Sequence, residues 1–397
     1  MTGGMTAQGR TRGYYIAIAL ILFGLLCGHV VSVVSSITLF HLLVGLAVIL
    51  SFIVSPPLPR FYYGVALYFL LYTVWTLSAT LLWAPPLEAK EAVKFAFIPL
   101  LVLSVLRLML KEPRTMLRVF FYVALAYILS MVVLGYVEHF TGFHLPTSVS
   151  HGADGEERFL STGLNYNPND YSVILIMAAL YLLAYSNHFR QRCDAWITAF
   201  AIVLVIPPLL WNDCRTGLTV LVLAMLFPLL RRIPRKVWIP MLILLLLASA
   251  TFAVLNWHLI ATRMQLYIAA FASLYDSYGL GFGLGGDEYY LALLNNYDLT
   301  RGLTNAHSYL LQLPLTSGLP VLLAFCAMIT LVMHHSSKLG RDLFWLMPLL
   351  YLLLLFSPSS SLYLWAHYLF LCIYICYAVY AHSATTQPTP STTPSAL

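Results

Sequence analysis

The stretch VFFYVALAYILSMVVLGYV, residues 119–137, decides the fold of this chain. It holds nineteen residues and no charged side chain, and about 20 apolar residues in a helix cross the roughly 30 Å hydrocarbon core of a membrane. Similar runs recur along all 397 residues, which are 60% hydrophobic and 9% charged, with a mean hydropathy of +0.83. Soluble domains carry about 25% charged residues. We therefore predict an all-α polytopic membrane protein with no separate soluble domain.

We predict about twelve transmembrane helices in one bundle, residues 1–382. A tail rich in Thr, Pro and Ser, residues 383–397, is expected to be disordered because it has no apolar residues to bury. The helices are expected at 14–34, 36–54, 62–83, 92–110, 119–137, 171–186, 195–211, 217–230, 237–255, 308–333, 343–356 and 361–381.

The basic residues divide unevenly between the two faces of this predicted bundle. Fifteen fall on one face and six on the other, and the positive-inside rule makes the richer face cytoplasmic. Both termini then lie in the cytoplasm. The outer face carries a loop at 138–170 and the largest loop, 256–306, between the ninth and tenth helices. The six outer basic residues are Lys90, Lys94, Arg158, Arg215, Arg263 and Arg301.

Two of these arginines stand at the ends of apolar spans. Arg215 lies in WNDCRTG, residues 211–217, a tight turn between two helices. N–H groups at a helix start together with a guanidinium form a phosphate site, although pairing with Asp213 is the alternative. Arg263 opens an apolar helical stripe that runs to Tyr275 and suits a helix lying on the membrane or on top of the bundle. Its alternative role is that of an interfacial anchor.

His307 is the candidate general base. It lies at the start of the tenth predicted helix, where Asn305 is a candidate N-cap. The positive end of a helix and nearby arginines disfavour the imidazolium, and a general base requires the neutral form. The alternative is a polar first-turn residue bonded to a loop carbonyl. Arg158 is a candidate helper in phosphate binding, whereas Arg301 has no role beyond solvation.

Other patterns predict less chemistry. The glycine run 279–286 lacks the preceding strand and the Lys-Ser/Thr of a nucleotide loop, so it predicts a hinge or a close backbone approach to substrate. Asp287 and Glu288 are expected to be dipole partners at a helix start. The spacing of three outer-loop histidines matches no zinc pattern, and we expect no metal. These histidines are His139, His144 and His151.

The chain resembles the O-antigen ligase branch of the O-antigen ligase/polymerase family of bacterial envelope glycosyltransferases. The resemblance rests on Arg215-Thr-Gly after an apolar span, on the stretch from Arg263 through YGLGFG (278–283), and on His307-Ser308 with Gly318 ten residues beyond Ser308. The segment 158–169, ending Asn-Pro-Asn, is also similar to the family's loop before its middle helices. The family's histidine pattern usually ends in Gly, Thr or Tyr where this chain has Val321.

The resemblance implies a twelve-helix bundle in the bacterial inner membrane, with a large periplasmic loop between helices nine and ten and an active site facing the periplasm. It implies metal-independent, inverting transfer of O-antigen polysaccharide from undecaprenyl pyrophosphate to a sugar hydroxyl of lipid A–core. Arg215, Arg263 and His307 are the implied essential residues. We expect no cofactor and no nucleic acid partner. The expected partners are the lipid-linked donor, the lipid A–core acceptor and membrane lipids.

Three alternatives remain open at this point. An O-antigen polymerase or a protein O-oligosaccharyltransferase belongs to the same superfamily. The Arg-x10-Gly pattern of many polymerases is absent after the outer arginines, which favours a ligase. From another class, a lipid or polysaccharide transporter usually carries acidic residues at mid-membrane and repeated broken helices. No predicted span has an acid at its middle.

Overall fold

A computed structural model shows a helical bundle. It describes residues 7–27, 32–34, 37–54, 56–83, 89–145, 160–165, 168–230, 237, 257–285, 308–340, 342–355 and 364–386. Its helices are α1 (Ala7–Cys27), α2 (Leu39–Val54), α3 (Arg60–Trp83), α4 (Ala89–Met109), α5 (Pro113–Thr141), α6 (Pro168–Phe189), α7 (Arg192–Trp211), α8 (Arg215–Leu230), α10 (Trp257–Asp276), α12 (Tyr309–Ser336), α13 (Leu343–Leu354) and α14 (Trp365–Thr386).

The ninth predicted span, 237–255, lies outside the described residues except Val237. Each of the other predicted spans overlaps one of these helices. Six of the described helices are long and apolar enough to cross a membrane, which identifies a membrane protein. They are α3, α5, α6, α7, α12 (continued through the 3-10 turn Ser337–Leu339) and α14. The count of twelve and the placement of the large outer loop stay predictions.

The structure corrects the boundary between the first two predicted spans. The helix predicted at 14–34 ends at Cys27, and a short antiparallel ladder follows, formed by β1 (Ser32–Val34) and β2 (Ile37–Thr38). β-Branched residues fill this stretch and favour a strand pair over a helix. The second predicted span, 36–54, accordingly begins as a helix only at Leu39.

Two predicted irregular segments contain helix. α5 continues to Thr141, where Gly142 caps it in the left-handed conformation, and α6 already begins at Pro168, so the ends of the loop predicted at 138–170 are helical. α14 continues to Thr386, so the first four residues of the predicted tail are also helical.

The hydrogen bonds between helix ends support the predicted alternation of helix direction. The Tyr14 hydroxyl donates to the Leu108 carbonyl (3.2 Å), which joins the N-terminal half of α1 to the end of α4. At the opposite face, the Ser308 hydroxyl donates to the Leu355 carbonyl (3.1 Å), which joins the start of α12 to the end of α13. Helix ends predicted to share a face therefore lie together. Which face is cytoplasmic stays a prediction.

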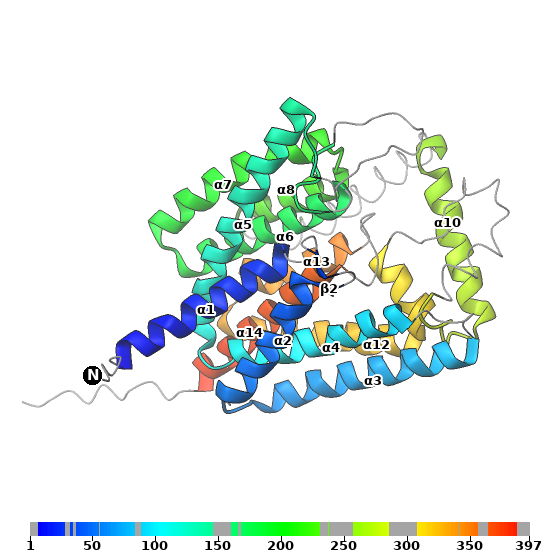
Figure 1. Ribbon diagram of the computed structural model, residues 1–397. Helices are drawn as coiled ribbons and strands as arrows, with labels where there is room; N and C mark the ends of the chain where they lie inside the picture. The colour runs from blue at the N-terminus through cyan, green and yellow to red at the C-terminus, as the bar shows by residue number, and fades with distance from the viewer. Residues whose placement is uncertain are drawn as a thin grey trace, which may run out of the picture.

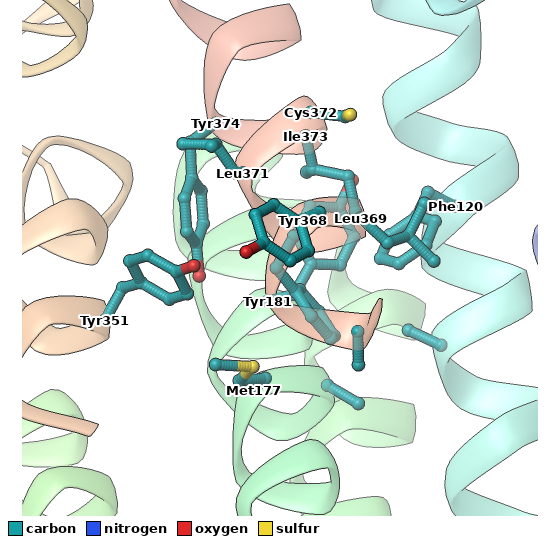
Figure 2. Packing of buried hydrophobic residues seen from close by; sticks show 14 of the residues in the cluster. Phe120, Met177, Tyr181, Tyr351, Tyr368, Leu369, Leu371, Cys372, Ile373 and Tyr374 are labelled. Atoms are coloured by element: carbon teal, nitrogen blue, oxygen red, sulfur yellow. The ribbon is translucent and has the colours of Figure 1, made fainter. Parts of the chain in front are cut away.

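The core is centred on α6 and α14, which are buried nearly all round. Figure 2 shows aromatic side chains from several helices meeting there. Tyr181 of α6 packs edge-on against Phe120 of α5 (ring centroids 5.0 Å apart), and Tyr351 of α13 packs against Tyr374 of α14 (5.6 Å). The peripheral helices expose apolar side chains instead, as Leu81 does on α3. Such outward apolar faces suit contact with lipid.

The helix α10 lies across the end of the bundle, crosswise to α3 and α12 (Figure 1). It contains the helix predicted from Arg263 to Tyr275. The predicted single apolar stripe is divided, because Ala270 and Leu274 pack against α12 while Phe271 and Tyr275 are exposed. The prediction of a helix on top of the bundle is therefore supported by the contact with α12.

Cysteine labelling tests the predicted orientation. Cys193 is exposed at the start of α7, on the face predicted to be cytoplasmic. In a variant with no other cysteine, a membrane-impermeant maleimide is expected to label Cys193 only after the membrane is permeabilised. A cysteine placed at Thr141, which is exposed at the other face, should be labelled in intact cells. The reverse pattern would invert the topology.

Candidate functional site

The turn between α7 and α8 presents Arg215 to solvent. α7 ends at Trp211, and Asp213 takes a positive φ of 50°, a conformation that Asp tolerates better than most residues. The Arg215 guanidinium donates to both carboxylate oxygens of Asp213, each at 2.9 Å. The side chains of Arg215 and Asp213 are 75% and 70% exposed. The structure thus shows the alternative predicted for Arg215, but an ion pair so open to water holds its partners weakly.

Asn212 fixes this turn to the loop before α6. Its side-chain oxygen accepts from the Ser161 N–H (2.8 Å), and its amide donates to the Ser161 carbonyl (2.7 Å). The same amide reaches the Pro168 carbonyl (3.3 Å) and the Ser172 hydroxyl (3.1 Å). One buried side chain therefore joins the Arg215 turn, the loop 160–165 and the first turn of α6.

Glu138 holds the other side of the same loop. This carboxylate is buried in the last turn of α5, and it accepts from the N–H groups of Thr162 (2.7 Å) and Gly163 (2.8 Å) and from the Thr162 hydroxyl (3.1 Å). Nδ1 of His144 lies 3.6 Å away. A buried carboxylate is tolerated when several donors satisfy it. Glu138 therefore stabilises the local backbone that frames the Arg215 turn.

Replacing Glu138 with Gln should loosen this loop. The amide accepts with one oxygen instead of two and carries no charge, so the free energy of unfolding should fall by about 2 kcal/mol. Thermal unfolding of the purified protein measures this. Asp276→Asn is the matched control, because Asp276 is an exposed carboxylate in the last turn of α10, and it should change stability by less than about 0.5 kcal/mol. Equal effects of the two substitutions would contradict the assignment.

The Cys214 thiol lies inside the turn. Burial raises its pKa, and this outweighs the opposing hydrogen bonds from Gly217 and Ser172. A protonated, buried thiol is a poor nucleophile, so Cys214 contributes packing to the turn and no reactive group.

The start of α12 differs from its prediction. The helix begins at Tyr309, so its N-cap is Ser308 and not Asn305. The Ser308 hydroxyl is fully buried and bonds to the Leu355 carbonyl instead of capping the helix. This bond fixes the chain immediately after His307 to the end of α13.

The glycine run approaches protein backbone closely. Gly281, Gly283 and Gly318 all have positive φ, and a Cβ on Gly283 would collide with the backbone of Thr80. The glycines therefore allow close packing against α3 and α12, and the predicted approach to substrate stays a prediction.

Only one of the predicted site residues has a described side chain. Arg215 is described fully, Arg263 is described only as backbone within α10, and Arg158 and His307 lie outside the described residues. Asp287, Glu288, Arg301 and His151 also lie outside them. The convergence of these groups on one site therefore stays a prediction.

The other outer-loop histidines make separate contacts. His139 stacks on Trp211 with ring centroids 3.8 Å apart, and His144 lies beside Glu138. Among the described residues, no group of three metal-ligating side chains gathers.

Sequence reasoning missed Glu138 and Asn212 as structural residues of the site. Glu138 follows the predicted end of an apolar span by one residue, and Asn212 precedes the Arg215 turn. Both positions could have been noticed in the sequence, since a polar residue beside the end of an apolar span often forms hydrogen bonds at the helix terminus. Their partners, Ser161 to Gly163, are brought close only by the fold.

A comparison with known proteins finds one similar bacterial biosynthesis protein. The chain is 22% identical over 359 residues to the teichuronic acid biosynthesis protein TuaE of Bacillus subtilis (strain 168). The match covers 79% of this chain and 71% of that protein. No protein-family model matches the chain.

Proposed function

We propose that this protein is a membrane glycosyltransferase of bacterial polysaccharide biosynthesis, and specifically a lipopolysaccharide O-antigen ligase. The observation that carries the proposal is the exposed Arg215 guanidinium at the start of α8, on the face opposite most basic connectors. Such a group binds phosphate oxygens. The similarity to TuaE supports polysaccharide biosynthesis as the process. Its name concerns teichuronic acid and not O antigen, so the ligase assignment rests on the sequence resemblance.

The proposed reaction joins O-antigen polysaccharide to lipid A–core. An acceptor hydroxyl attacks the anomeric carbon of the glycan, and the bond from that carbon to the pyrophosphate oxygen breaks. Undecaprenyl pyrophosphate leaves with the bonding electron pair, and the anomeric configuration inverts. No metal or nucleotide takes part in the proposed step.

The proposed roles follow from the chemistry of the side chains. His307 takes the acceptor proton, as a neutral imidazole does near pH 7. Arg215 and Arg263 bind the pyrophosphate and stabilise the charge it gains as it leaves. Arg158 assists them, and an arginine does not serve as the base because it stays protonated.

The contact of Asn212 with Ser161 adds support for the part proposed for Arg158. Ser161 is hydrogen-bonded on both its N–H and its carbonyl to Asn212. Arg158 precedes Ser161 by three residues, and Arg215 follows Asn212 by three. Two outer arginines are thus tethered through short chain segments to one hydrogen-bonded pair.

The proposal is tested in a strain that lacks this protein. If the protein is a ligase, its loss leaves lipid-linked glycan in the outer leaflet of the inner membrane together with bare lipid A–core. A transporter that moves the lipid-linked glycan would leave it in the inner leaflet. Accumulation in the inner leaflet would therefore overturn the proposal.

A further inference from the structure

A groove lies between α6, α7 and α8 on the basic-rich face, close to the start of α13. Figure 1 shows the three helices, in green, side by side. The groove encloses about 820 Å³, within the range of about 300–1,000 Å³ that holds small-molecule ligands. Small side chains make room for it. Its walls are mostly apolar and include Leu183, Ala199, Ile202, Val203, Ile206 and Met225.

The mouth of this groove is polar. Ser186 and Thr198 line it, but their hydroxyls already bond to each other (2.6 Å) and to backbone carbonyls. Arg190 also lines it, and its exposed guanidinium makes no hydrogen bond or ion pair with other residues of the described chain. Within the part of the chain that the structure describes, Arg190 is thus an unpaired cation where an apolar groove meets water.

The backbone at Arg190 is strained. Its φ is 52°, and its N–H donates to the Ser186 carbonyl (3.0 Å), which closes the end of α6. Glycine adopts this left-handed helix-ending conformation freely, whereas a residue with a Cβ is strained there. Ending the helix does not require an arginine. What an arginine provides at this position, and a glycine would not, is a cationic side chain at the groove mouth.

The charges around the mouth are mainly positive. Arg192 follows two residues later, and Arg118, whose main interaction is with Tyr122, lies within electrostatic range of Asp194. Asp194 is buried below the surface. Asp342, next to the groove residue Leu343, is paired with His188. The groove thus combines an acyl-chain-compatible wall with an anion-attracting rim.

We propose that this groove binds an anionic glycerophospholipid. Arg190 holds the lipid phosphate, and one acyl chain lies between α7 and α8 along Ile202 and Val203. Basic pockets between transmembrane helices bind lipid headgroups of this charge. The bound lipid braces the α7–α8 pair, whose opposite end carries Arg215. The proposal does not depend on the proposed reaction.

The test uses the purified full-length protein in detergent, titrated with phosphatidylglycerol or with phosphatidylcholine. Bound lipid is counted by native mass spectrometry, and thermal stability is read in parallel. Phosphatidylglycerol should bind preferentially and raise the melting temperature. Arg190→Gly removes the cation and also relieves the backbone strain, so the lipid-free variant should stay folded while its affinity for phosphatidylglycerol falls about tenfold.

Two further variants distinguish binding of the lipid headgroup from binding of the acyl chain. Arg192→Ala removes a neighbouring cation that does not line the groove, and it should bind phosphatidylglycerol as the unmodified protein does. Ala199→Trp fills the groove at an exposed position and should lose binding with Arg190 intact. Unchanged binding by Arg190→Gly, an equal loss in Arg192→Ala, or equal binding of phosphatidylcholine would overturn the proposal.

Discussion

Gly283→Ala is expected to prevent stable folding of this protein. Gly283 has a φ of 79°, and an added Cβ would collide with the backbone N and Cα of Thr80 on α3. Backbone atoms cannot rotate away as a side chain does, so the substitution should lower the free energy of unfolding by roughly 3 kcal/mol or more.

The collision matters because the glycine run pairs with a broken helix. α12 departs from helical geometry at Gly318, and Pro320 has no N–H to donate to the Thr316 carbonyl. The N–H of Gly283 donates to that carbonyl instead (2.9 Å), and the N–H of Phe282 donates to the Leu315 carbonyl (2.7 Å). Backbone groups at membrane depth need such partners. Displacing the loop would leave these two carbonyls without these donors.

Gly285→Ala is the matched control for this prediction. Gly285 has a similar φ of 73°, but nothing lies within 4 Å of an added Cβ. The only cost of this substitution should be the strain of alanine in the left-handed conformation, which lowers the free energy of unfolding by about 1 kcal/mol. Thermal unfolding and the yield of monodisperse protein measure both variants. Equal stability of Gly283→Ala and Gly285→Ala would show that the contact with Thr80 is not required.

The second large effect is expected for His307→Ala. In the proposed reaction His307 removes the acceptor proton, and a positioned general base contributes about 10²–10⁴-fold to the rate. The rate of transfer by the purified variant should fall by that factor, so that no ladder of glycan-bearing lipid A–core is seen. Donor binding should largely survive, because the arginines hold the pyrophosphate.

His139→Ala provides the control for this substitution. His139 also lies on the face predicted to be periplasmic, but its ring stacks on Trp211, and it has no proposed part in the chemistry. Its variant should retain transfer. Normal turnover by His307→Ala would remove His307 from the role of base without removing Arg215 from the binding of phosphate.

The helices were predictable because apolar runs of membrane length are a strong local signal. The errors arose where local patterns compete, as at Ser32–Thr38, where β-branched residues form a ladder inside a region predicted as two spans. The end of α5 was predicted too early and the start of α6 too late, because Gly142 caps α5 and Pro168 is the first residue of α6.

The site was predictable in its residue types but not in its contacts. The exposed Arg215 turn followed from charge and spacing, whereas its pairing with Asp213 was one of two alternatives. The contacts of Asn212 with Ser161 and of Glu138 with Thr162 depend on segments up to 51 residues apart. The close approach of Gly283 to Thr80 spans a still longer separation. No local pattern reports such contacts.

The most direct test of the proposed function is transfer by the purified protein. It is mixed with undecaprenyl-pyrophosphate-linked O antigen and lipid A–core, without metal or nucleotide, and the products are resolved as a ladder. The proposal predicts glycan attached to lipid A–core, with release of undecaprenyl pyrophosphate. Longer lipid-linked glycan formed without lipid A–core would indicate a polymerase instead, and no glycan transfer by a folded protein would contradict the account.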